Sequence, residues 1–367
     1  MNKSISFIIV AYNSENSINH SLGSLVKQDF PHHLIEVILV DSNSSDHTKR
    51  IMLDFQKKET SFSRVLVLDN PGKYLACGWN VALKAVTGDV VLRVDAHTEF
   101  PSDFISKNAQ LIENGKDICG GKVLSILQKD TPWNRTLLAA ENSMFGGGFT
   151  FFRRGETAQY TNTLAFAAYK KEVFEVVGNY DERLVRTEDN EMHYRMRKAG
   201  FKFFFSPEIV SYRFSRSSLN GLLRQKFLNG YWVGLTHAVC PMAFSVFYLV
   251  PLLFVMAFIV CLGLLAVTTW PLLILLSAYA VVLLFALMGA IQKNGLYWQI
   301  LALPFFIFAL HLWYGIGTAK GLCEENLKMS KTFKRKGGIA GFLYYIAQLL
   351  LLPLKTIGWI TNILFNS

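Results

Sequence analysis

Short apolar runs alternate with helix-like stretches over the first 236 residues. Four of these runs, Ile5 to Val10, Glu36 to Val40, Arg64 to Leu68 and Val90 to Val94, are rich in β-branched residues and end in polar or turn-forming residues. Helix-like segments separate the first run from the second and, at Leu75 to Ala85, the third from the fourth. Strands that alternate with helices predict an α/β fold with a doubly wound, mostly parallel sheet.

Polar residues follow all four predicted strands, at Asn13, Asp41, Lys73 and Asp95. In sheets of this kind ligands bind beyond the carboxyl ends of the strands, so these side chains should converge. A single Asp, Asn or Gly after a strand is usually explained by a turn alone. Because the pattern recurs at four strand ends, a shared binding site is the better interpretation.

Asp95 and His97 occupy alternate positions just after the fourth strand. In an extended chain their carboxylate and imidazole can point the same way and share one cation. Mg²⁺ or Mn²⁺ on a diphosphate takes few protein ligands, since phosphate oxygens and water supply the rest. Histidine slightly favours Mn²⁺. The alternative is that His97 only bonds a neighbouring loop.

Residues 146–163 are rich in Gly, Thr and Arg and are expected to form a long loop that carries Arg153 and Arg154. Residues 165–177 then indicate a strand that feeds a helix. The two arginines could neutralise phosphate, although most surface arginines serve solubility.

Glu188 and Asp189 open a helix that should run to Ala199, with Thr187 as its N-cap and Gly200 as its stop. Carboxylates in a first turn are stabilised by the helix dipole, so ordinary capping explains them. A carboxylate held at such a position is also suited to take a proton from a hydroxyl group. Both interpretations stay open at this point.

Three segments beyond residue 241 are long and nearly uncharged: 242–267, 271–291 and 298–318. At about 1.5 Å per residue each can cross a hydrocarbon core of about 30 Å. Three crossings from a cytoplasmic front domain would place the basic segment Lys328 to Lys336 outside, against the positive-inside tendency. Either one segment is re-entrant or the tendency fails in this loop.

The segment around Ser217 to Trp232 has apolar residues at helical spacing with basic residues between them. It predicts either an amphipathic helix at the membrane surface or a helix packed on the front domain. The expected organisation along the chain is a cytoplasmic α/β domain at 1–215, an interface helix at 216–238, transmembrane helices at 239–321, a basic loop at 322–338 and an apolar interfacial or transmembrane helix at 339–367.

Composition supports a membrane protein, because 51% of the residues are hydrophobic and the mean hydropathy is +0.27. The apolar stretch at the N-terminus has strand length and lacks a cleavage site, so no signal peptide is expected. The five cysteines are far apart and should be reduced packing residues. A net charge of +10 beside apolar helices favours anionic lipid over nucleic acid, for which no motif is present.

These features together resemble the family 2 glycosyltransferases with a GT-A fold. FIIVAYN (7–13) resembles their first nucleotide-binding strand, and ILVDSNSSD (38–46) the strand whose aspartate reads the base. The segment 70–97 resembles the approach to the Asp-x-Asp metal motif, and 162–208 the acceptor half with its Glu-Asp pair. The Asp-Ala-His form of the motif and the RQKFLNGYW segment are most similar to the ExoA-like enzymes of exopolysaccharide assembly.

The resemblance implies an inverting, metal-dependent enzyme that moves a sugar from a nucleoside diphosphate sugar, UDP-sugar first of all, to a polyprenyl-linked acceptor. It implies Asp189 as catalytic base beside Glu188, and Mn²⁺ or Mg²⁺ on Asp95 and His97. The implied donor contacts are Ala11, Tyr12, Asn13, Glu15, Asp41, Ser42, Lys73, Asn80 and Asp95, and the implied acceptor or phosphate contacts are Arg153, Arg154, Arg224, Gln225 and Trp232.

Two departures from the family pattern bear on this reading. The metal motif ends in His97, where the family usually has an aspartate. Gln225 and Trp232 stand at other spacing than the Gln-x-x-Arg-Trp signature of processive synthases, which favours transfer of one sugar. The alternatives are a polyprenyl-phosphate sugar synthase, a processive polysaccharide synthase, and a nucleotide-binding membrane scaffold without catalysis. The expected location is a bacterial plasma membrane with the front domain in the cytoplasm, and homo-oligomerisation stays open.

Overall fold

The computed structural model describes residues 3–143 and 151–333, and the chain divides into two compact units. The first unit consists of Met1–Leu222 and Ala280–Phe308. The second consists of Leu223–Tyr279 and Ala309–Ser367. The first unit is therefore not continuous in sequence, whereas the domain expected over residues 1–215 was.

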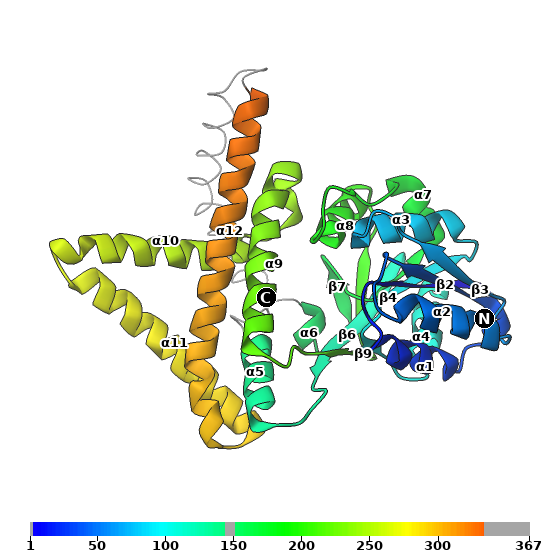
Figure 1. Ribbon diagram of the computed structural model, residues 1–367, viewed down its shortest axis with the longest axis horizontal. Coiled ribbons are helices and arrows are strands. Elements are labelled where there is room, and N and C mark those ends of the chain that lie inside the picture. The colour runs from blue at the N-terminus through cyan, green and yellow to red at the C-terminus, as the bar shows by residue number, and fades with distance from the viewer. Residues whose placement is uncertain (1–2, 144–150, 334–367) are drawn as a thin grey trace. The chain divides into compact units, whose positions relative to one another are not determined.

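Nine strands of the described residues form one sheet, in the order β3-β2-β1-β4-β8-β6-β9-β5 with β7 paired to β9 (Figure 1). They are β1 (Ile5–Ala11), β2 (Ile35–Asp41), β3 (Arg64–Asp69), β4 (Val90–Asp95), β5 (Thr98–Glu99), β6 (Ile118–Ile126), β7 (Gln159–Thr161), β8 (Ala168–Lys170) and β9 (Phe203–Phe214). The helices are α1 (Ile18–Val26), α2 (Thr48–Lys58), α3 (Leu75–Ala85), α4 (Phe104–Glu113), α5 (Pro132–Asn142), α6 (Phe151–Arg154), α7 (Lys171–Val177), α8 (Glu188–Lys198), α9 (Leu219–Val239), α10 (Val250–Gly263), α11 (Trp270–Asn294) and α12 (Leu303–Phe333).

The first half of the sheet is parallel, as the sequence predicted. β1 lies between β2 and β4, and β2 also pairs with β3, all in parallel register. In the second half the sheet is mixed, because β8 runs antiparallel to both β4 and β6 while β6 and β9 are parallel. The α/β fold class is confirmed, with antiparallel pairs added to the expected parallel ones.

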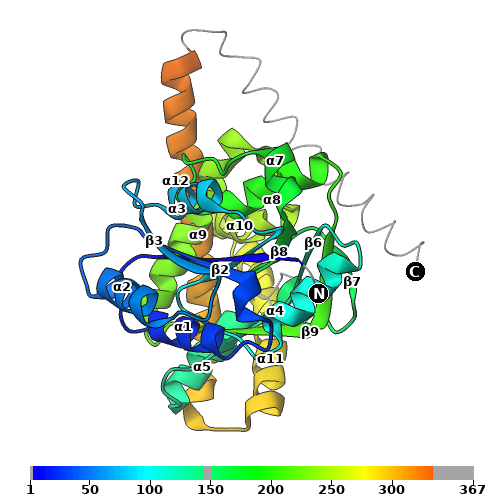
Figure 2. The ribbon, with the colours of Figure 1, turned by 90° about the vertical axis from the view of Figure 1, so that its right-hand side faces the viewer.

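The two faces of the sheet carry separate cores, as alternation of side chains along a strand requires. Ile5, Phe7 and Ile9 of β1 pack with α1, α2 and α4 on one face. Ile8 and Val10 pack on the other face with α3, α7 and α8. Figures 1 and 2 show these two groups of helices on opposite sides of the strands. β1 and β2 are buried over their full length, as is usual for parallel strands covered on both faces.

Helix α5 packs against η6 (Trp298–Ala302), which belongs to the same unit although it is far away in sequence. The rings of Trp133 and Trp298 meet edge to face with centroids 5.3 Å apart. The Thr136 hydroxyl lies 3.3 Å from the Tyr297 hydroxyl. These contacts are the reason why residues 280–308 count with the first unit.

In the second unit α9 and α12 approach each other through glycines. A Cβ on Gly230 would lie 2.0 Å from the carbonyl oxygen of Tyr314, and one on Gly317 would lie 2.2 Å from that of Phe227. The contacts advance in the same direction along both helices, from Gly230 with Tyr314 to Gly234 with Thr318 and Gly321. The two helices are therefore parallel and in backbone contact.

Three helical segments are long and apolar enough to cross a membrane by length and composition: Phe247–Ala266, Trp270–Asn294 and Trp298–Glu324. They coincide with the three apolar segments found in the sequence. The segment 322–338 was expected to be a loop, but α12 continues to Phe333. Its remaining residues and the segment 339–367 lie outside the described residues.

Two further local expectations need correction. The described part of 146–163 is not only loop, because it contains α6 and β7. Thr187 stands at the N-cap position of α8 but makes no side-chain capping bond there. Its backbone is left-handed, with φ of 67°, whereas an N-cap usually has extended backbone.

Candidate active site

The strand ends nominated by the sequence lie next to one another. In the register of the sheet Asp41 is level with Ala11 of β1, and Asp95 is level with Val10. Asp69 of β3 is in turn level with Asp41. The carboxyl ends of β3, β2, β1 and β4 thus form one edge, where ligands bind in doubly wound sheets.

Asp41 presents an unused acceptor at this edge. Its carboxylate is 2% exposed, and Oδ2 accepts a bond from the backbone N–H of Ser44 at 3.2 Å. Oδ1 is buried and has no hydrogen-bond partner among the described residues. Buried acceptors are almost always paired, so this atom is suited to receive an N–H donor from a ligand such as a nucleotide base.

The turns after β1 and β2 are joined by side-chain bonds. The Asn13 N–H donates to the Ser44 hydroxyl at 3.0 Å, and Asn13 Oδ1 accepts from the Ser45 N–H at 2.8 Å. Glu15 accepts from the backbone N–H of His47 at 3.0 Å. Tyr12 is exposed beside them. Glu15 and Asn13 therefore hold the rim of the site, while Tyr12 is free to contact a ligand.

Left-handed backbone gathers in the loops of the site. Asn13, Asn43, Lys73 and Thr187 have φ between 46° and 67°. Each follows a strand of the parallel half or precedes the Glu-Asp pair. Residues other than glycine rarely adopt this conformation, and where they do they cluster at functional sites. Lys73 is also exposed, which leaves its ammonium accessible to a phosphate.

Asp95 and His97 are placed to share a cation. Asp95 Oδ2 and His97 Nε2 are 3.9 Å apart, and both side chains are partly exposed. Partial burial lowers the pKa of His97, and the charges of Arg213 and Arg216 act in the same sense against the raising effect of Asp95. A neutral imidazole with a free lone pair is the form that binds metals. No group of three or more His, Cys, Asp or Glu side chains among the described residues could hold a metal ion, so phosphate oxygens and water would complete the shell.

A buried ionic cluster that the sequence did not reveal lies beside His97. Glu141 of α5 is 2% exposed and accepts bonds from Arg213 Nη2 and from the Ser215 hydroxyl. Arg153 Nη1 lies 3.9 Å from the same carboxylate. Arg213 pairs across the sheet with Thr98, next to His97. No local motif marks this cluster, because Arg213 and Ser215 are 72 and 74 residues away from Glu141 in the sequence.

Glu188 and Asp189 begin α8 as predicted, in different surroundings. Glu188 is 5% exposed, whereas Asp189 is only partly buried. Burial raises the pKa of Glu188 to about 8, and the neighbouring charge of Asp189 adds to the effect. The raised pKa favours the protonated form of Glu188, and Asp189 is the member of the pair that solvent can reach.

Arg93 lies beneath this pair, in the buried part of β4. Its guanidinium is 5.2 Å from the ring centroid of Trp79, 5.5 Å from that of Tyr180 and 5.9 Å from that of Tyr169. Asp189 and Glu188 are its carboxylate neighbours. A desolvated cation among aromatic faces is held firmly, so Arg93 provides fixed positive charge behind the two carboxylates.

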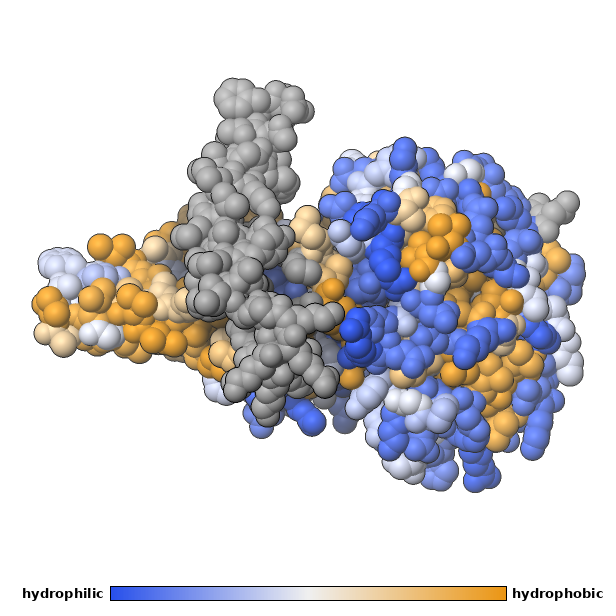
Figure 3. All heavy atoms as spheres, turned by 90° about the horizontal axis from the view of Figure 1, so that it is seen from above, coloured by the Kyte–Doolittle hydropathy of each residue, from blue (hydrophilic) through white to orange (hydrophobic). Residues whose placement is uncertain are grey.

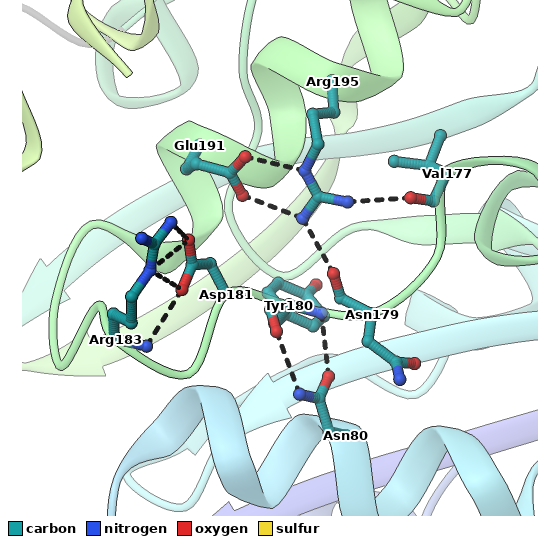
Figure 4. A network of polar contacts seen from close by, with 8 residues as sticks. All are labelled: Asn80, Val177, Asn179, Tyr180, Asp181, Arg183, Glu191 and Arg195. Carbon is teal, nitrogen blue, oxygen red and sulfur yellow. Dashed lines mark hydrogen bonds and ion pairs between the residues drawn. The ribbon is translucent and has the colours of Figure 1, made fainter. Parts of the chain in front are cut away.

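Helix α8 is tied to the loop before it and through that loop to α3, as Figure 4 shows. Arg195 pairs with Glu191 at 2.7 Å and donates to the carbonyls of Val177 and Asn179, both at 2.8 Å. The Asn80 amide bonds the backbone N–H and C=O of Tyr180 at 2.8 and 3.0 Å. Asn80 was predicted as a donor contact, but its side chain is engaged with this loop.

The remaining predicted contacts divide between the two units. Arg154 is exposed and donates to the Asn142 carbonyl at 2.9 Å. Arg224, Gln225 and Trp232 belong to α9 in the second unit. Their role in acceptor binding stays a prediction.

Comparison with known proteins supports a ligand-binding site at the carboxyl ends of β3, β2, β1 and β4. The sequence model of the glycosyl transferase family 2 matches residues 6–178, from β1 through α7. A Methanococcus voltae protein named dolichyl N-acetyl-alpha-D-glucosaminyl phosphate 3-beta-D-2,3-diacetamido-2,3-dideoxy-beta-D-glucuronosyltransferase is 25% identical over 337 residues, which is 90% of this chain and 99% of that protein. The succinoglycan biosynthesis protein ExoA of Rhizobium meliloti (strain 1021) is 29% identical over 195 residues, 52% of this chain and 57% of that protein.

The fold has a counterpart among solved structures. The mannosyltransferase PcManGT from Pyrobaculum calidifontis, solved in complex with GDP-Man and Mn²⁺, matches with a TM-score of 0.55 at 16% identity over 87% of this chain and 88% of that one. At this identity the likeness concerns the fold. Together with the matched family and the geometry of the strand ends, it confirms the resemblance found in the sequence. Residues 6–178 therefore match the glycosyl transferase family 2, and the fold is of the GT-A type.

Proposed function

We propose that this chain transfers a single sugar, with inversion, from a nucleoside diphosphate sugar to a polyprenyl-linked acceptor at the cytoplasmic face of a bacterial plasma membrane. The observation that carries the proposal is the arrangement at one sheet edge of a buried unpaired acceptor on Asp41, the Asp95 and His97 pair, and the Glu188 and Asp189 carboxylates. A UDP-sugar is the donor that fits best, since the Asp41 carboxylate would accept the N–H of a uracil ring.

Asp95 and His97 would hold Mn²⁺ or Mg²⁺ on the diphosphate. The bound ion would neutralise the charge that develops on the leaving diphosphate. The 3.9 Å between Asp95 Oδ2 and His97 Nε2 suits two ligands of one cation. The Mn²⁺ and GDP-Man named with PcManGT, a protein of the same fold, support this assignment. Lys73, exposed at the end of β3, would add positive charge near the phosphates.

Asp189 would act as the general base. It would take the proton of the acceptor hydroxyl while the hydroxyl oxygen forms a bond to the anomeric carbon and the bond from that carbon to the diphosphate breaks. Attack opposite to the leaving group inverts the configuration. The raised pKa of Glu188 favours its protonated form, which cannot act as base, and Arg93 stabilises the carboxylate of Asp189 from behind.

The names of the relatives support the acceptor class that we propose. The name of the Methanococcus voltae protein gives a dolichyl-linked sugar phosphate as acceptor, and ExoA is named for succinoglycan biosynthesis. The first name favours a lipid-linked saccharide as acceptor, and the second favours a role in polysaccharide assembly. A polyprenyl-phosphate sugar synthase would instead use the bare lipid phosphate, and a processive synthase would make long products, so product length from a radiolabelled donor separates these from single transfer.

Replacement of the base tests the proposal. Asp189→Asn should keep donor affinity, because no donor contact is assigned to Asp189, but lower the rate of transfer by about 100-fold or more, the usual contribution of a general base. Donor binding is measured by metal-dependent thermal stabilisation and transfer by labelled product. Glu175→Gln, an exposed carboxylate on α7, is the control. Normal turnover by Asp189→Asn would contradict the assignment, and lack of donor binding by the native chain would favour the scaffold alternative.

A further inference from the structure

The parallel contact between α9 and α12 constrains which helices can enter a membrane. α12 contains most of Trp298–Glu324, the third apolar segment, whereas α9 is not among the described helices apolar enough to cross. Both helices rise by about 1.5 Å per residue. Because they are parallel, one contact between them fixes which residues of α9 and α12 lie at the same height along their common axis. A membrane that contains one helix of such a pair therefore contains the matching part of the other.

The glycine contacts give the level. Gly230 lies against Tyr314 and Thr318, and Gly317 lies against Phe227 and Tyr231. When this register is continued toward the N-terminal ends of the two helices, Arg224 and Lys226 of α9 lie at the same height as residues near His311 of α12. That residue is the midpoint of the Trp298–Glu324 segment.

A crossing by α12 would thus carry two cationic side chains of α9 to the bilayer centre. Arg224 is exposed, so it would face lipid directly. Arginine and lysine are among the least favourable residues at this depth. α12 itself adds Lys320 and Glu324, which lie 3.8 Å apart, and the Tyr231 hydroxyl bonds Glu324. Polar and charged side chains of this kind are typical of helices that lie in the headgroup region of a membrane.

The two preceding segments have the opposite character. Phe247–Ala266 and Trp270–Asn294 have mean hydropathies of 2.9 and 2.6, against 1.8 for Trp298–Glu324. Within Trp270–Asn294 the one buried residue is Tyr279, which contacts Phe254 of α10 and His311 of α12. Figure 3 shows hydrophobic side chains over the left-hand part of the molecule, where α10 and α11 lie. Lys293, near the end of α11, is the one charged residue in these two segments, and an apolar surface of this extent needs hydrocarbon as its partner.

We propose that only the Phe247–Ala266 and Trp270–Asn294 helices cross the bilayer, while α9 and α12 lie paired in its headgroup region. The partner of the crossing helices is lipid hydrocarbon, and that of the α9 and α12 pair is the polar interface. Two crossings return the chain to the side on which it entered. The basic segment Lys328 to Lys336 then lies on the side of the catalytic domain, and the conflict with the positive-inside tendency disappears.

Cysteine labelling tests this count, and its outcome does not depend on the proposed function. Cys77 and Cys261 are partly exposed, so both are replaced by serine in every variant. Cys323, exposed at the end of the third apolar segment, is then the native reporter. When Cys323 is also replaced by serine, Lys57→Cys on α2 reports the side of the catalytic domain, and Thr269→Cys reports the connection between α10 and α11. A membrane-impermeant maleimide is applied to sealed vesicles of each orientation and to detergent-solubilised samples.

We expect Cys323 and Lys57→Cys to react in vesicles of one orientation and Thr269→Cys in those of the other, with all three reactive in detergent. Reaction of Cys323 together with Thr269→Cys would mean three crossings and would overturn the proposal. Reaction of Thr269→Cys on the side of Lys57→Cys would also overturn it, since the helices would then not cross. Thermal stability of each variant in detergent, compared with the native chain, excludes misfolding as the cause.

Discussion

Among single residues, Asp41 gives the most direct indication of a ligand. One oxygen of its buried carboxylate has no hydrogen-bond partner among the described residues. Folding leaves such an atom unpaired only at a cost. A donor group from a bound base would remove this cost, so binding and specificity should both depend on Asp41.

Asp41→Ala should weaken donor binding by about 10- to 100-fold, the loss expected for a hydrogen bond to a charged group, with a smaller effect on kcat. Asp69→Ala is the matched control, because Asp69 is level with Asp41 on the next strand but its side chain is 68% exposed. Donor titrations and initial rates measure both. An equal effect of the two substitutions would argue against base recognition by Asp41.

Glu188 gives a pH dependence of stability. Burial raises the pKa of Glu188 to about 8, above its ordinary value of 4.5. The unfolded chain releases this proton at lower pH than the folded chain, so Glu188 destabilises the fold increasingly as pH rises from about 4.5 to 8. Glu188→Gln copies the protonated form. Its thermal stability relative to the native chain should increase over this range, measured without metal or donor, and a constant difference would contradict the shift.

The residues that follow strands could be predicted from the sequence, because local turn chemistry marks them. Asp41, Asp95 and His97 are of this kind. Arg93 and Arg213 could not be predicted: Arg93 lies inside an apolar run, and the partner of Arg213 is Glu141 on a helix 72 residues away. Pairings of this kind depend on the fold and have no local signal.

At the scale of elements, the first four strands match their predicted ranges within a residue or so, and the helix predicted at Leu75 to Ala85 has those bounds in the structure. The short strands β5 and β7 were missed, since two or three residues give no periodic pattern, whereas β8 and α7 lie within the strand and helix predicted over residues 165–177. The basic stretch after residue 322 was assigned to a loop from its charge, although lysine and glutamate are good helix formers and α12 continues through it.

The contact between α9 and α12 predicts opposite effects for two glycine-to-alanine changes. Gly317→Ala should lower thermal stability, because its Cβ would lie 2.2 Å from the Phe227 carbonyl oxygen and the helices would have to separate. Gly289→Ala on α11 should be neutral or stabilising, since nothing lies within 4 Å and alanine is the better helix former. Thermal unfolding in detergent measures both. Equal stability of the two variants would show that the contact is not close.

For the whole molecule, the catalytic unit depends on residues far along the chain. Trp133 and Thr136 of α5 are covered by Trp298 and Tyr297 of the 280–308 segment. The domain predicted from the sequence, residues 1–215, does not include these contacts. The sequence of residues 297–302 carries no signal that this segment packs on α5, which lies more than 150 residues earlier.

A chain that ends at Leu222 should therefore expose the α5 surface and associate in the absence of detergent. Trp133→Ser should reduce this association in the shortened chain but lower thermal stability in the full chain, where the Trp133 ring has a partner. Size-exclusion chromatography and thermal unfolding give the two readouts. A monodisperse shortened chain with the native Trp133 would contradict the dependence.

The parallel course of α9 and α12 also sets an order of events during biosynthesis. The ribosome makes α9 first, but Gly230 meets the Tyr314 carbonyl only after 84 further residues, including both apolar helices, have been made. Until then Phe227 and Tyr231 lack their partners on α12. α9 can therefore complete its packing only after the two intervening helices have been inserted. A chain in which insertion has stalled would keep α9 exposed, and quality-control proteases that recognise exposed apolar helices would remove it.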